Sequence, residues 1–163
     1  MSDCCSANHS CDNNNSEPIN TADFLCPACN KSGQKVRVET VRGLLKDELA
    51  SNVLNAPYYL CLNPTCEVAY FSLESGRTFK QKDLKTPIWF KESANPVLAC
   101  YCMHVTKDAV VDAVLNHGAS TLKEIQTMTG ANTGKDCLVK NPAGKCCGAN
   151  IKEMIKEALI LKK

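Results

Sequence analysis

Cys100-Tyr101-Cys102, followed by Cys137 and then by the pair Cys146-Cys147, marks the stretch of the chain that decides its fold. The segment 103–136 between these groups contains no cysteine. Its apolar residues recur at helical spacing in two short runs, which predicts a helical hairpin. After Cys147, apolar residues fall at i, i+3, i+4, i+7 and i+8 from Ile151, which predicts a third, amphipathic helix.

The ends of the hairpin helices carry their own signals. Thr106 is expected to cap the first helix and Gly118 to end it. Ser120 is expected to cap the second helix. Its packed face is expected to consist of Leu122, Ile125 and Met128. A glycine-rich loop, 130–136, then leads into Cys137.

This layout suits an iron–sulfur cluster. A [2Fe–2S] cluster is held by four thiolates, two on each iron. Cys100 and Cys102 can supply one iron, and Cys137 and Cys147 the other. Glycines in the loop would let backbone N–H groups turn toward sulfur, and the final helix would point the positive end of its dipole at an anionic cluster.

The two adjacent cysteines leave the fourth ligand open. From Cys147 the apolar residues of the final helix lie at +4, +7 and +8, so its thiol is expected on the packed face. From Cys146 they lie at +5, +8 and +9, which turns that thiol away. Cys147 is therefore favoured, and Cys146 becomes a candidate copper ligand beside the cluster. His104 could replace a cysteine as histidine does in Rieske centres, but four cysteines are already present.

A second set of cysteines lies earlier in the chain. Cys26-Pro27-Ala28-Cys29 and the pair Cys61 and Cys66 form C-x2-C and C-x4-C knuckles, which together predict one closed, tetrahedral zinc site. A redox-active C-x-x-C of the thioredoxin kind is the alternative. It is disfavoured because no helical pattern follows Cys29 and because a second pair exists.

The chain around the knuckles predicts a mixed structure. A strand is expected over 36–41 and a helix over 43–54. Residues 68–71 should form a strand that turns at Ser75-Gly76 into a hairpin. The polar segment 91–96 is expected to be a linker.

Residues 1–23 are rich in Ser, Asn and Asp and are expected to be a disordered tail. Cys4, Cys5, His9 and Cys11 form a soft ligand set within this tail, suited to Cu(I). They are equally consistent with incidental cysteines of a polar segment.

Composition limits the class of protein. The chain has 163 residues, twelve cysteines, few aromatic residues and a net charge of +2. Small domains with so little apolar material usually need metal for stability. No apolar run follows Met1 and none approaches the ~18 residues of a membrane span, so we expect a cytoplasmic protein with reduced thiols and no membrane insertion. Dispersed Lys and Arg give no support for a nucleic-acid partner.

The motifs also carry a family resemblance. The C-x-C, the helical hairpin, the glycine-rich loop and the cysteine opening a final helix resemble the [2Fe–2S] domain of bacterioferritin-associated ferredoxins (BFD). That family normally has C-x-x-C where this chain places nine residues between Cys137 and Cys147. The long interval, the double cysteine and the stretch 66–71 resemble the N-terminal part of CopZ-type copper chaperones, and the resemblance covers roughly residues 24–160.

The resemblance implies an α+β protein. It would consist of the tail 1–23, a zinc-stapled mixed domain at 24–92, and a helical BFD-like [2Fe–2S] domain at 97–163.

The resemblance also implies copper trafficking. A reduced cluster would convert Cu(II) to Cu(I), which thiolates would hold for an acceptor such as a copper-exporting P-type ATPase. In the family, a separate heavy-metal-associated domain carries the transferable copper, and this chain ends at Lys163 without one. Copper binding is then expected of the tail, of Cys146, or of another protein that carries such a domain.

A plain ferredoxin-like electron carrier with a structural zinc site is the alternative function. No nucleophile–base pair is evident, so the expected role is non-enzymatic metal carriage, with one-electron copper reduction at most.

Overall fold

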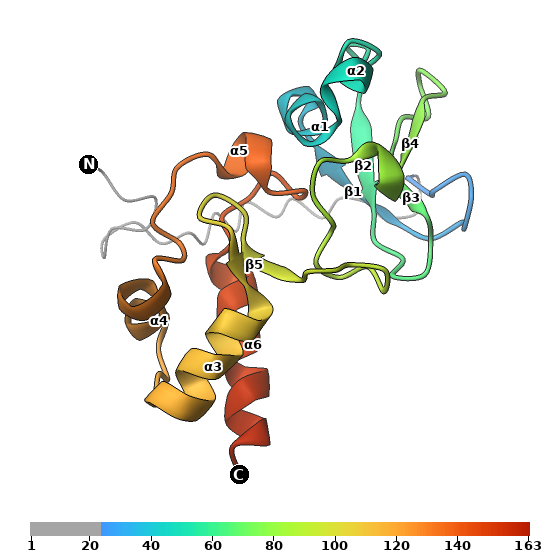
Figure 1. The fold of residues 1–163 in the computed structure, drawn as a ribbon. Helices are drawn as coiled ribbons and strands as arrows, with labels where there is room; N and C mark the ends of the chain where they lie inside the picture. The colour runs from blue at the N-terminus through green and yellow to red at the C-terminus, as the bar shows by residue number, and fades with distance from the viewer. Residues whose placement is uncertain (1–23) are drawn as a thin grey trace. The chain divides into compact units, whose positions relative to one another are not determined.

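The computed structural model describes residues 24–163, which divide into two compact units (Figure 1). The first, called the zinc unit below, comprises 24–95 together with 138–145. The second, called the cluster unit, comprises 96–137 and 146–163. The tail 1–23 and its candidate ligands Cys4, Cys5, His9 and Cys11 lie outside the described residues.

The zinc unit is built on an antiparallel sheet. Its elements are β1 (Gly33–Val36), α1 (Val38–Leu44), α2 (Asp47–Ala50), β2 (Tyr58–Cys61), β3 (Val68–Phe71), β4 (Thr78–Lys80) and the 3-10 helix η2 (Gln81–Asp83). Within residues 24–95 the four strands follow the order β1-β2-β3-β4, and Gly33 pairs with Cys61. The chain thus reaches the sheet directly from the first cysteine knuckle and leaves β2 directly into the second.

The two faces of this sheet are buried in different ways. Successive strand residues point to opposite faces, and along β2 the side chains of Tyr58 and Leu60 pack with Val41 and Leu44 of α1. Between them, Tyr59 and Cys61 pack in a second cluster with Cys26, Cys66, Val68 and Phe71. One face therefore carries an ordinary apolar core and the other carries the cysteine knuckles.

Two predicted elements of this unit are wrong. The strand expected over 36–41 ends at Val36, because Val41, Leu44 and Leu45 bury themselves at helical spacing in and just after α1. The helix expected over 43–54 is broken by Leu45, which adopts an extended conformation and pairs with Leu84. The hairpin at Ser75-Gly76 is confirmed, with Gly76 at φ +67° between β3 and β4.

The segment 138–145 packs within the zinc unit although it lies between two cysteines of the cluster unit. The Tyr70 hydroxyl donates a buried hydrogen bond of 2.6 Å to the carbonyl oxygen of Pro142. Gly43 permits the backbone of Val139 to approach closely, since a Cβ at position 43 would lie 2.3 Å from the Val139 oxygen. The long interval between the cysteines is thus a fixed part of the zinc unit's fold.

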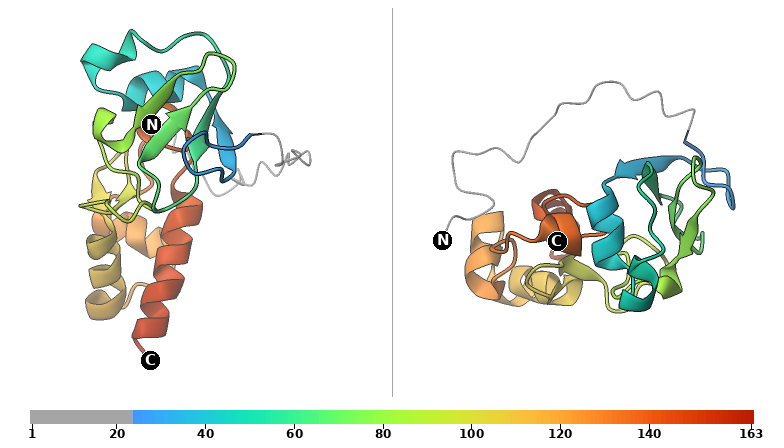
Figure 2. Two further views of the ribbon diagram at one scale, coloured as in Figure 1. Left: turned by 90° about the vertical axis from the view of Figure 1, so that its right-hand side faces the viewer. Right: turned by 90° about the horizontal axis from the view of Figure 1, so that it is seen from above.

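The cluster unit is mainly helical. Its elements are β5 (Leu98–Cys100), β6 (Val105–Thr106), α3 (Lys107–His117), α4 (Leu122–Thr129) and α6 (Gly148–Leu161), and its residue Cys137 opens the short helix α5 (Cys137–Lys140). Helices α3 and α6 run against each other and α4 packs on both (Figure 2). The core contains Val110, Ala113, Val114, Ile125, Ile151, Met154, Ile155 and Ala158. All three predicted helices are confirmed.

Most helix ends follow the sequence signals. The Thr106 hydroxyl accepts a hydrogen bond from the Ala109 N–H at 3.2 Å, and Gly118 ends α3 at φ +74°. The cap of α4 is Thr121 rather than the expected Ser120. A reciprocal capping box with Glu124 decides this, because the Glu124 carboxylate accepts from the Thr121 N–H.

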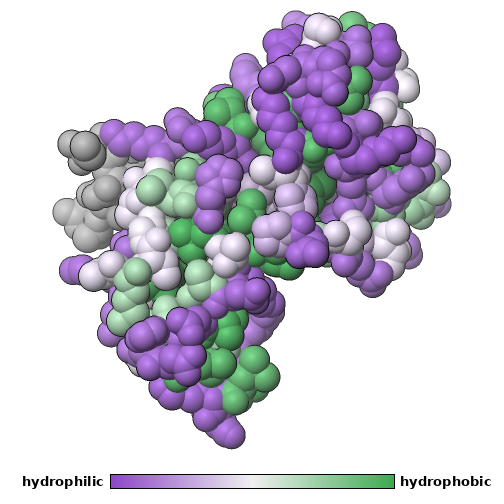
Figure 3. Space-filling view, in the orientation of Figure 1, coloured by the Kyte–Doolittle hydropathy of each residue, from purple (hydrophilic) through white to green (hydrophobic). Residues whose placement is uncertain are grey.

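The packed face of α4 is narrower than the sequence predicts. Ile125 is buried, Leu122 is half-buried, and Met128 is half exposed. Hydrophilic residues dominate the face drawn in Figure 3, and the last turn of α6 exposes Ile160 and Leu161. Among the helices described, none has both the length and the apolar character required to cross a membrane.

Candidate metal centres

The first candidate centre gathers four sulfur atoms beneath the sheet of the zinc unit. They belong to Cys26, Cys29, Cys61 and Cys66, and all lie within 4.8 Å of one another. Cys29 Sγ and Cys61 Sγ are 3.6 Å apart. Three of these four cysteines are buried and Cys29 is half-buried.

Two tight turns aim these sulfurs at one point. In the first knuckle the Cys26 N–H donates to the Lys31 oxygen at 2.9 Å, and Asn30 takes a left-handed conformation at φ +58°. In the second knuckle the Thr65 N–H donates to the Asn63 side-chain oxygen at 3.2 Å. Side-chain-to-backbone bonds of this kind hold a turn without regular secondary structure.

Burial controls the protonation of this site. It raises the pKa of Cys61 to about 12 and also raises the pKa of Cys66. Burial acts in the same direction on Cys29, but hydrogen bonds from the Lys31 backbone and the Asn63 side chain outweigh it and lower the pKa of Cys29 to about 6. Four such thiols can all be deprotonated only if a cation joins them, and a closed tetrathiolate is the donor set that zinc prefers. The residues therefore fit zinc.

Lys91 is a part of this site that sequence reasoning missed. It lies in the segment 91–96 that the sequence predicts to be a polar linker, yet Lys91 is only 2% exposed. Its ammonium group donates to the carbonyl oxygens of Asn63 at 2.7 Å, Cys66 at 3.2 Å and Val68 at 3.0 Å. The three acceptors lie in the second knuckle and at the start of β3, so the ammonium group joins the knuckle to the sheet.

The position of Lys91 has an electrostatic consequence. A divalent cation with four thiolates carries a net negative charge, and a buried ammonium beside it compensates part of that charge. The Glu92 N–H adds a bond of 3.0 Å to the Pro64 oxygen, so the backbone after Lys91 also holds the knuckle. A lone lysine in a polar stretch gives no sequence signal of this role.

The second candidate centre gathers cysteines from four places in the cluster unit. Cys100 ends β5, Cys102 follows two residues later, Cys137 opens α5 and Cys147 directly precedes α6. The Cys102 and Cys137 sulfurs are 3.4 Å apart. The thiols of Cys100 and Cys147 form a hydrogen bond with each other. Each cysteine of the first predicted pair, Cys100 and Cys102, therefore lies next to a cysteine of the second predicted pair, Cys137 and Cys147.

Hydrogen-bond donors surround the Cys100 sulfur. Its pKa is lowered to about 6, chiefly by the hydrogen bond with the Cys147 thiol and then by backbone N–H groups, against the effect of burial. One of these donors is the Asn132 N–H, 3.3 Å from Cys100 Sγ. The expected donors were the loop glycines, but this N–H belongs to Asn132. Gly134 instead makes room, since a Cβ there would lie 2.4 Å from the Cβ of Cys102.

Both adjacent cysteines reach this site. The Cys147 thiol is buried and contacts Cys100 and Cys137, and its pKa is raised by those hydrogen bonds. The half-buried Cys146 thiol also contacts Cys137. Their positions on a helix face do not decide between them, because α6 begins only at Gly148 and Cys147 is its N-cap. Burial and the contact with Cys100 distinguish Cys147 from Cys146.

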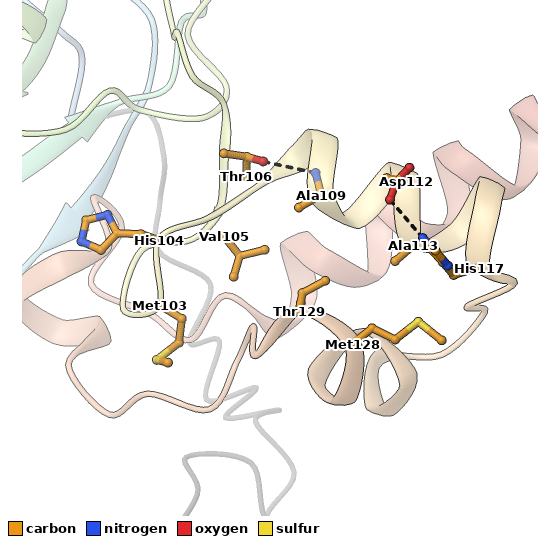
Figure 4. Close-up of a pocket in the computed structure, with 10 residues that line it drawn as sticks. All are labelled: Met103, His104, Val105, Thr106, Ala109, Asp112, Ala113, His117, Met128 and Thr129. Atoms are coloured by element: carbon orange, nitrogen blue, oxygen red, sulfur yellow. Dashed lines mark hydrogen bonds and ion pairs between the residues drawn. The ribbon is translucent and has the colours of Figure 1, made fainter.

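A pocket of about 460 Å³ lies beside the C-x-C loop. Figure 4 shows Met103 and His104 at one end, with the His104 ring turned away from the other lining residues, and Met128 and His117 at the opposite end. The His117 ring lies 3.4 Å from the Asp112 carboxylate. The thioethers and imidazoles that line this pocket therefore do not converge on one point.

Comparisons with known proteins match both units. A family model described as a zinc binding domain, of the CopZ type, matches residues 23–85. A family model described as a BFD-like [2Fe–2S] binding domain matches residues 98–157. The two matches include the cysteines of the first and the second centre respectively, and they show that the chain carries a zinc-binding domain and a [2Fe–2S]-binding domain.

Two relatives extend the comparison. The copper chaperone CopZ of Archaeoglobus fulgidus is 37% identical over 122 residues, which cover 75% of this chain and 57% of that protein. The chain thus corresponds to little more than half of that relative. The X-ray structure of the Archaeoglobus fulgidus CopZ N-terminal domain aligns with a TM-score of 0.68 and 33% identity, covering 80% of this chain and 97% of that one.

The role of Lys91 can be tested by Lys91→Met, which keeps the length of the side chain and removes its charge and donors. We expect zinc affinity to fall about 10- to 100-fold, the usual cost of losing a partner around a metal site. Competition against a chromophoric chelator measures it. Lys85→Met is the matched control, because Lys85 makes only an exposed ion pair with Asp47. Equal zinc affinity of the two variants would contradict the role.

Proposed function

Because the chain belongs to the CopZ family and carries its zinc-binding domain followed by its BFD-like [2Fe–2S] domain, we propose that it is a copper-trafficking metallochaperone. It takes up Cu(II), reduces it by one electron, holds the Cu(I) with thiolates and passes it on. The recipient is a copper-exporting P-type ATPase or a separate protein with a heavy-metal-associated domain. The role is metal carriage and not turnover of an organic substrate.

We assign the eight cysteines of the two centres to the resident metals. Zinc is held by Cys26, Cys29, Cys61 and Cys66, and the cluster by Cys100, Cys102, Cys137 and Cys147. The convergence of the first four sulfurs within 4.8 Å supports the zinc set. The burial of Cys147 and its bond with Cys100 support its place as the fourth cluster ligand.

The thiols that remain carry the copper proposal. Twelve cysteines less eight leave four: Cys4, Cys5, Cys11 and Cys146. Thiolates and the nearby imidazole of His9 are the soft donors that Cu(I) prefers. Cys146 is half-buried in contact with Cys137, so a copper ligand there would lie next to the cluster.

The cluster unit is suited to a one-electron step. When bound, a [2Fe–2S] cluster supplies single electrons, and one electron converts one Cu(II) to one Cu(I). The chain's own part is to lower the charge on the cluster sulfurs through backbone N–H groups such as that of Asn132. A thiol beside this site can then bind the copper ion where it is reduced.

The assignment of the fourth cluster ligand predicts opposite results for two neighbouring serine variants. Cys147→Ser is expected to abolish or strongly alter the visible absorption of the cluster, because a buried ligand is lost. Cys146→Ser, the matched control, should leave that absorption nearly unchanged. Visible absorption and EPR of the anaerobically purified variants measure this. The reverse pattern would assign the cluster to Cys146.

The copper proposal is tested by anaerobic titration. Dithionite-reduced protein, freed of excess reductant, is expected to be reoxidised by one equivalent of Cu(II), and the Cu(I) formed should stay bound. Removal of residues 1–15 should weaken Cu(I) binding without slowing the reduction, because the cluster ligands remain. The EPR signal of the reduced cluster follows the first step, and a competing Cu(I) chelator measures the second.

Two outcomes would change the proposal. A cluster that does not react with copper, in a protein that holds no Cu(I), would favour a ferredoxin-like electron carrier. Undiminished Cu(I) retention after removal of residues 1–15 would move the copper ligands from the tail to Cys146 or another site.

A further inference from the structure

Asn132 occupies a fixed position at the second metal centre. It lies two residues after Gly130, which ends α4, and adopts a left-handed conformation with φ +62°. The side chain of Asn132 is 2% exposed. The turn is held from both sides, since the Thr133 hydroxyl donates to the backbone carbonyl of Gly130 at 2.7 Å and the Gln126 side-chain amide donates to the backbone carbonyl of Asn132 at 3.4 Å.

The backbone of Asn132 forms a hydrogen bond with Cys100, a ligand of the first predicted pair. Its N–H donates to the Cys100 sulfur over 3.3 Å. The left-handed conformation is one that asparagine adopts more readily than most residues other than glycine. A larger or β-branched residue at this position would disturb the bond to Cys100.

The side chain of Asn132 contacts the adjacent cysteines Cys146 and Cys147. Its Oδ1 lies 3.1 Å from the Cys146 sulfur and 3.6 Å from the Cys147 sulfur, where it accepts from the thiols. A thiolate that ligates iron has no proton to donate. A carboxamide can turn by half a rotation and offer its NH2 group in place of its oxygen, with no change of shape. The same side chain is therefore complementary to the thiol and to the thiolate.

We propose that Asn132 is a positioning residue of the cluster site that bridges its two sides and raises the reduction potential of the cluster. It holds Cys100 through its backbone and Cys147 through its carboxamide. Hydrogen bonds to cluster sulfurs stabilise the reduced, more negative state and so raise the potential. Within residues 24–163, the Asn132 N–H contacts the Cys100 sulfur, and the Asn132 carboxamide lies 3.6 Å from the sulfur of the assigned ligand Cys147 and 3.1 Å from that of Cys146, which stands beside the ligand set.

Two variants separate the backbone from the side chain. Asn132→Gly keeps the N–H and tolerates the left-handed conformation, and it removes only the carboxamide. Asn132→Asp keeps the shape but replaces the NH2 donors with a negative charge. We expect the potential to fall in the glycine variant and to fall further in the aspartate variant. A shift equivalent to a tenfold change in the ratio of oxidised to reduced cluster is about 59 mV for one electron.

Redox titration of the full-length protein, followed by EPR of the reduced cluster, measures these shifts. Thr133→Ala is the control, because it perturbs the same turn without touching a sulfur. Failure of both Asn132 variants to hold a cluster that Thr133→Ala holds would also support the positioning role. Wild-type potentials in both Asn132 variants would overturn the proposal.

Discussion

Repulsion between closely spaced thiolates is the constraint on which both halves of this molecule depend. Four sulfurs within 4.8 Å in the zinc unit can all lose their protons only around a cation. Four thiolates around a divalent cation keep a net negative charge, and the buried ammonium of Lys91, which is not itself a ligand, compensates part of it. The cluster unit meets the same problem with neutral donors, such as the Asn132 N–H on Cys100. The zinc site is thus surrounded by a charged donor, the Lys91 ammonium, and the cluster site by neutral backbone N–H donors such as that of Asn132.

The long interval between Cys137 and Cys147 has a structural use. Its residues 138–145 pack into the zinc unit, where Tyr70 binds the Pro142 carbonyl and Gly43 admits the Val139 backbone. The chain therefore leaves the cluster unit after one cysteine and returns to it at Cys146.

Sequence patterns predicted the parts of this structure that depend on local chemistry. The helical hairpin, its cap at Thr106 and its end at Gly118 follow from periodicity and capping. The cysteine spacings predicted two metal-binding units, which the family matches confirm. The short helix α1 was missed because its valines favour a strand locally, and only packing against the sheet reverses that preference. Lys91 and Asn132 were missed because their partners lie far away in the sequence, and no local pattern indicates them.

Metal content of the anaerobically purified full-length protein is the most direct test of an account based on two separate four-cysteine centres. We predict about one zinc and two irons per chain, with the absorption and EPR of a [2Fe–2S] cluster. Cys61→Ser should remove the zinc, while Cys102→Ser should remove or alter the cluster and leave the zinc in place. A [4Fe–4S] spectrum, or iron in place of zinc in protein produced with adequate supplies of both metals, would contradict the account.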